Sequence, residues 1–77
     1  MPKAFVLINV ESGSEEGVLE QIAKVDGIEQ AFYSYGVYDI IAKVKADTME
    51  KLRETVTEKI RTMTKVRSTL TLIIMQE

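Results

Sequence analysis

The segment at residues 31–44, AFYSYGVYDIIAKV, restricts the possible folds of this chain more than any other. Two runs rich in aromatic and β-branched residues, which favour strands, flank Gly36. Glycine adopts positive φ angles without steric cost, so Gly36 can form the tight reversal of a β-hairpin. Asp39 follows shortly after, although aspartate is a poor strand former. The pattern predicts a hairpin with a carboxylate at its mouth, which either stabilises the turn or binds a ligand.

The chain is short, with 77 residues, and contains neither cysteine nor histidine. A domain of this size buries only about 60% of its unfolded surface, so association with other subunits is an economical source of further stability. Without thiol or imidazole groups it has no ordinary zinc site, no cysteine nucleophile and no histidine base. We therefore expect a single domain over residues 1–77 with no metal, no cofactor and no catalytic residue.

The charge balance also excludes some functions. A formal net charge of −2 with 45% hydrophobic residues is typical of a soluble globular domain, whereas nucleic-acid-binding modules normally present a basic face. The apolar run near the N-terminus is too short to span a membrane and lacks the features of a signal peptide. We expect a cytoplasmic protein that binds neither nucleic acid nor membrane directly.

The first third of the chain has the pattern of a strand followed by a helix. Residues 3–10 form an almost continuous apolar run, which predicts a strand buried on both faces. Ser12 and Glu15 match a capping box, and apolar residues then recur at helical spacing. Gly27 is expected to end this helix as its C-cap.

The rest of the chain adds three strands and a second helix. The hairpin strands are predicted at about residues 28–35 and 38–45, and the last strand at residues 66–75. Between them, a helix with one apolar stripe is expected to begin at Asp47 or Thr48. The order β-α-β-β-α-β predicts an α+β, ferredoxin-like sandwich, a four-stranded antiparallel sheet with two helices on one face.

Strict alternation along the strands assigns residues to the two faces of this sheet. The face predicted to receive the helices is apolar and comprises Ala4, Val6, Ile8, Val10, Tyr38, Ile40, Ala42, Val44, Val66, Leu70, Leu72 and Ile74. The other face is about half apolar and comprises Phe5, Leu7, Val37, Ile41, Ile73 and Met75, with Asn9, Asp39, Thr69 and Thr71 among them. An exposed apolar patch of this kind usually marks an interface, so we predict that this face packs on another subunit.

The polar residues of that second face are expected to meet at one end of the sheet. Asn9 ends the first strand, Asp39 begins the third, and Thr69 and Thr71 begin the fourth. Together they suit a small zwitterion, with Asp39 for an ammonium and hydroxyl or backbone N–H groups near Gly36 for a carboxylate. Asp39 fits equally well a structural role in capping the turn or pairing with a lysine, and the threonines are also ordinary strand formers.

The hairpin sequence YGVYDI resembles the glycine–tyrosine–aspartate signature of the Lrp/AsnC family, in its C-terminal effector-binding (RAM) domain. The resemblance covers the whole chain. It includes the opening strand AFVLINV, Gly27 before the second strand, the helix start DTM and the closing VRSTLT.

The resemblance implies a dimeric α/β sandwich whose dimers assemble into rings, commonly octamers, with an amino-acid effector bound between dimers. It assigns effector binding to Gly36, Tyr38 and Asp39 and, in the matching last strand, to Thr69 and Thr71. Residues 1–77 show no pattern of the helix-turn-helix domain that full-length members carry. We therefore expect a stand-alone module that modulates a transcription regulator or amino-acid metabolism without binding DNA itself, with a full-length Lrp/AsnC-type regulator as a candidate partner.

Two other functions fit the fold. One is an assembly module with no small ligand, which predicts no effector-dependent change in stability or mass. The other is a small enzyme of the dimeric α/β-barrel type, whose sites generally need a histidine or convergent polar residues inside the barrel. Because no base–nucleophile pair has a recognisable spacing here, we expect no enzymatic activity.

Overall fold

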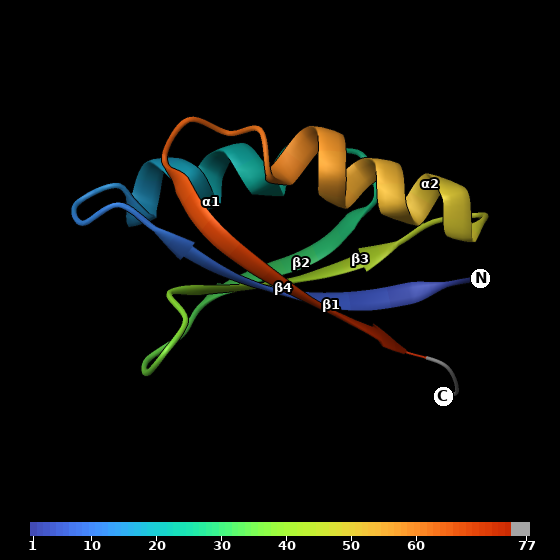
Figure 1. Ribbon diagram of the computed structural model, residues 1–77, viewed down its shortest axis with the longest axis horizontal. Helices are drawn as coiled ribbons and strands as arrows, with labels where there is room; N and C mark the ends of the chain where they lie inside the picture. Colours follow the sequence, from blue (N-terminus) through green and yellow to red (C-terminus); the bar gives the residue numbers. More distant parts are fainter. Residues whose placement is uncertain (75–77) are drawn as a thin grey trace.

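The computed structural model describes residues 1–74, and in it a four-stranded sheet carries both helices on one face (Figure 1). The elements are β1 (Lys3–Val10), α1 (Glu15–Ala23), β2 (Ile28–Tyr33), β3 (Ile40–Lys45), α2 (Met49–Glu54), the π-helical turn η1 (Thr55–Ile60) and β4 (Val66–Ile74). The strand order is β2-β3-β1-β4, and every neighbouring pair is antiparallel. The predicted α+β, ferredoxin-like fold is confirmed. Met75 lies outside the described residues.

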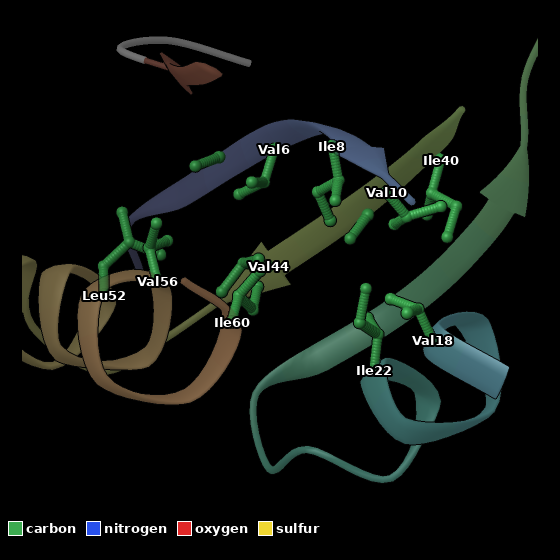
Figure 2. Packing of buried hydrophobic residues seen from close by; sticks show 12 residues of the cluster. Val6, Ile8, Val10, Val18, Ile22, Ile40, Val44, Leu52, Val56 and Ile60 are labelled. Carbon is green, nitrogen blue, oxygen red and sulfur yellow. The ribbon is translucent and has the colours of Figure 1, made fainter. Parts of the chain in front are cut away.

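The core lies between the sheet and the helices (Figure 2). One face of β1 and β3 packs against the apolar stripes of the helices. Both surfaces are buried because each covers the hydrophobic side chains of the other. Its members are Ala4, Val6, Ile8, Val10, Val18, Ile22, Ile40, Ala42, Val44, Leu52, Val56 and Ile60.

The second helix has the predicted position but two geometries. The Thr48 side chain caps its start by accepting a hydrogen bond from the Lys51 N–H at 3.1 Å. The helix then widens into η1, where the Arg61 N–H donates to the Val56 carbonyl at 3.0 Å, five residues back. Spacings of three and four residues in the apolar stripe do not distinguish such a turn from a regular α-helix.

The ends of the first helix differ from the sequence prediction. Ser14, not Ser12, occupies the N-cap position, so the predicted Ser12–Glu15 capping box is wrong. Lys24 is the C-cap, and Gly27 instead lies in the following turn with φ +100°. A Cβ at Gly27 would lie 3.2 Å from the Lys45 carbonyl oxygen, so this turn has little room for a side chain.

The hairpin forms as predicted, but with shorter strands. The Ser34 N–H donates to the Asp39 carbonyl at 2.9 Å and closes a loop in which Gly36 has φ +125°. Val37 and Tyr38, which alternation placed on the sheet faces, belong to this loop. Space around Gly36 is open, so the loop conformation alone accounts for the glycine.

The sheet face away from the helices is apolar and partly exposed. Phe32, Ile41, Leu7 and Leu70 lie opposite one another across all four strands, and Phe32 and Leu70 are 48% and 44% exposed. We call this face the open face. Within one chain, only one side of β1 is therefore buried. The prediction that β1 is buried on both faces is wrong for a single chain.

The face assignment of β4 is the main correction to the sequence prediction. Val10 pairs with Val66, but Asn9 pairs with Ser68, so Arg67 is an extra residue in a β-bulge. One extra residue reverses the alternation for the remainder of a strand. Leu70, Leu72 and Ile74 therefore lie on the open face, and Thr69, Thr71 and Ile73 lie on the helix-covered side, each opposite to its predicted face.

Candidate functional site

Asp39 ties the mouth of the hairpin to the central strand. Its N–H donates to the Ile8 carbonyl at 2.9 Å, and its Oδ2 accepts a hydrogen bond from the Val10 N–H at 2.9 Å. The carboxylate thus takes the place of a backbone carbonyl where β3 begins. It does not pair with Lys43, whose Nζ lies 3.9 Å from Glu29 Oε1. A structural role for Asp39 is therefore established by its geometry.

That role leaves one carboxylate oxygen available. Among residues 1–74, Asp39 Oδ1 has no hydrogen bond or ion pair. Asp39 lines a polar depression of about 420 Å³ together with Asn9, Val10, Arg67 and Ser68, which we call the Asp39 depression. Asn9 Nδ2 lies 3.4 Å from Ser68 Oγ at its rim. The depression therefore offers a carboxylate, a guanidinium and two neutral polar groups to a ligand.

The structure brings together only some of the residues predicted for the site. Asn9 and Asp39 meet at one end of the sheet, as the topology indicates. Gly36 and Tyr38 lie in the adjacent hairpin loop but do not line the depression. Thr69 and Thr71 were predicted on the same face as Asp39, and this placement is wrong because of the bulge at Arg67.

Two residues of the depression, Arg67 and Ser68, have no role in the sequence prediction. With strict alternation, the sequence predicts a solvated Arg67 side chain. Nothing in the local sequence marks a bulge. In the structure the bulge places Arg67 beside the end of β1, where it lines the depression together with Asp39. Only the pairing register with β1 reveals this position.

Neither a metal cluster nor a membrane-spanning helix is found in the described part of the chain. Residues 1–74 contain no group of three or more acidic residues close enough to hold a metal ion. No helix formed by these residues is long and apolar enough to cross a membrane.

Together these features define a small ferredoxin-like domain with a charged depression at the mouth of its hairpin. The family model of the Lrp/AsnC ligand-binding domain matches residues 3–77, and the chain belongs to this family. The chain is 37% identical over 73 residues to an uncharacterised HTH-type transcriptional regulator of Pyrococcus furiosus, covering 91% of this chain and 49% of that protein. It is 33% identical over 73 residues to the regulatory protein AsnC of Haemophilus influenzae, covering 94% of this chain and 49% of AsnC.

A solved structure agrees with this assignment. The crystal structure of FFRP-DM1 superposes with a TM-score of 0.94 at 37% identity, covering 97% of this chain and 100% of that one. The chain spans about half the length of the curated relatives it matches, which are transcription regulators.

Proposed function

We propose that this domain binds a free amino acid at the Asp39 depression and, as an oligomer, modulates a transcription regulator or amino-acid metabolism without binding DNA itself. The observation that carries the proposal is the presence of a carboxylate, Asp39, and a guanidinium, Arg67, in one polar depression. An amino acid carries the complementary pair, an ammonium for Asp39 and a carboxylate for Arg67. Membership of a ligand-binding family supports the same conclusion.

Within one chain, the five residues that the family resemblance assigns to the effector do not share one side of the sheet. Thr69 and Thr71 lie on the helix-covered side, and Asp39 lies at the end of the open face. We propose that Gly36, Tyr38 and Asp39 of one subunit and the two threonines of another contact an effector bound between subunits. Gly36 contributes backbone groups in an exposed loop, and Tyr38 is half-buried beside it.

The open face is the surface that supports association with other subunits. Its apolar row crosses the sheet from Phe32 to Leu70, and the next row adds Phe5 and Leu72, 36% and 48% exposed. Burying such a face against a second copy removes apolar surface from water at about 25 cal/mol per Å². We propose that dimers form through this face and associate further into rings such as octamers, alone or with a full-length Lrp/AsnC-type regulator.

Native mass spectrometry with each of the twenty amino acids tests the proposal. Asn in place of Asp39 keeps an oxygen for the Val10 N–H but removes the charge. Since a hydrogen bond to a charged group contributes about 1.5–3 kcal/mol, Asp39→Asn should weaken binding by about tenfold or more. Glu20→Gln removes one negative charge from an exposed position on α1 and should leave binding unchanged. Equal binding by wild type and Asp39→Asn would refute the role of Asp39.

A purely structural module is the second candidate, because the apolar row of the open face favours assembly whether or not a ligand binds. It predicts the same mass and the same thermal midpoint with every amino acid. A bound amino acid, by contrast, stabilises the species that holds it by mass action.

A further inference from the structure

A second concave surface lies on the helix-covered side of the sheet, between β4 and the segment formed by α2 and η1. We call it the β4 groove. It has a volume of about 350 Å³, within the usual range for small-molecule sites. Its lining residues are Leu52, Arg53, Val56, Thr57, Arg61, Thr69, Thr71 and Ile73.

The groove is positively charged although the chain carries a net charge of −2. Arg53 and Arg61 both line it, and no acidic residue does. In the described chain, residues 1–74, neither guanidinium has a hydrogen bond or an ion pair. Three helix glutamates border a neighbouring depression that shares Arg53 and Thr57 with the groove.

The remaining lining combines free hydroxyls with an apolar floor. Within residues 1–74, the side chains of Thr57, Thr69 and Thr71 form no hydrogen bond, so their hydroxyls can serve a ligand. Leu52 is fully buried beneath them, and Val56 is 6% exposed. Such a lining suits a short hydrocarbon segment with a polar group at each end.

The helix geometry separates the two cations. Arg53 lies in α2, and Arg61 follows η1 eight residues further along the chain. Their long side chains can converge on a short ligand, and each guanidinium can hold a carboxylate through two parallel hydrogen bonds. A singly charged ligand engages one of them and leaves the other unused.

We propose that the β4 groove binds small dicarboxylates with a short apolar carbon chain, with Arg53 and Arg61 each holding one carboxylate. The inference goes beyond the proposed function, because the groove and the Asp39 depression share no lining residue and the groove takes a ligand of its own. An acidic amino acid and its 2-oxo acid share this chemistry.

Calorimetric titration of the whole chain with glutarate tests the groove separately from the Asp39 depression, because glutarate has two carboxylates and no ammonium. Glutamate and 2-oxoglutarate then distinguish the two sources of the chemistry. Butyrate and inorganic phosphate lack the second carboxylate and the carbon chain, respectively, and both should bind at least about tenfold more weakly than glutarate.

Arg53→Gln and Arg61→Gln should each weaken glutarate binding by about tenfold or more. Lys59→Gln removes the same charge from an exposed position that does not line the groove, and it should have no effect. No measurable glutarate binding, equal binding of butyrate, or an equal loss in Lys59→Gln would overturn the inference.

The Asp39→Asn variant separates this inference from the proposed function. Glutarate binding that persists in Asp39→Asn and disappears in the arginine variants supports the groove. Amino-acid binding that needs Asp39, together with glutarate binding that is unchanged in Arg53→Gln and Arg61→Gln, upholds the proposed function and overturns the dicarboxylate inference.

Discussion

The two faces of the sheet are built from similar apolar residues but end in different environments. On the helix-covered face, Ile8 and Ile40 are fully buried by the chain's own helices. On the open face, the same strands expose Leu7 and Ile41 in part, together with Phe32. Burial on the first face stabilises the fold of one subunit, whereas burial on the second requires another molecule. Changes on the first face should therefore alter unfolding at any protein concentration, and changes on the second should alter assembly.

The largest effect is expected on the helix-covered face. Ile8→Ala removes buried carbon atoms at a fully enclosed position and should lower the free energy of unfolding by about 2–5 kcal/mol. Ile8→Val should cost about 0.5–1.5 kcal/mol and keeps the comparison measurable if the alanine variant does not fold. Urea unfolding at two protein concentrations measures both losses. A loss that depended strongly on concentration would contradict the assignment of Ile8 to the subunit core.

Leu70→Lys should act on the open face. A charge at the β4 end of the apolar row should dissociate the assembly and remove the stability that association adds, about 2.7 kcal/mol at a concentration 100-fold above the dissociation constant. Analytical ultracentrifugation measures the change in mass. Ile73→Lys is the matched control, because Ile73 is 37% exposed on the same strand but on the other side of the sheet. Equal dissociation by both variants would break the distinction between the two faces.

Thr48→Ala should weaken the helical cover without affecting the open face. The alanine variant loses the hydrogen bond that the Thr48 side chain accepts from the Lys51 N–H and should cost about 1 kcal/mol. Thermal unfolding measures the loss, and the mass of the assembly should not change. Thr48→Ser keeps the capping oxygen and should retain most of the stability. A change in mass would show that the helices also contribute to the interface.

The smallest effect tests the corrected register of β4. Thr71 lies opposite Val6, which is fully buried, so Thr71→Val replaces a hydroxyl with a methyl group on the helix-covered side. We expect a gain of about 0.5 kcal/mol and an unchanged assembly. Dissociation of the dimer formed through the open face would instead place Thr71 on that face, as strict alternation predicts.

The topology and most of the core follow from the sequence because they depend on local periodicity. The alternation in Ala4, Val6 and Ile8 and the helical spacing of Leu52 and Val56 specify which sides are buried. Hydrophobic residues that cannot be covered within the chain give the same alternation. The sequence therefore predicts an apolar open face without naming what covers it.

The site was less predictable because it depends on pairing between distant strands. Asp39 stands out in the sequence, because aspartate is a poor strand former and yet lies at the start of a predicted strand. The bulge at Arg67 has no glycine or proline to mark it, and it moved Thr69 and Thr71 to the other side. Arg53 and Arg61 look like solvated helix residues until β4 is placed beside them.

The strand order also determines when the fold can form. The central strand β1 pairs with β3 and with β4, and its first residue, Lys3, lies beside Ile74, so the two residues come from nearly opposite ends of the chain. No local hairpin stabilises β1, because its connection to each neighbour passes through other elements. During synthesis, the second edge of β1 can be paired only after β4, the last strand of this domain, has emerged. We expect folding to be limited by this late long-range closure, in the intermediate rate regime of mixed α/β domains, with the apolar strand exposed to chaperones until then.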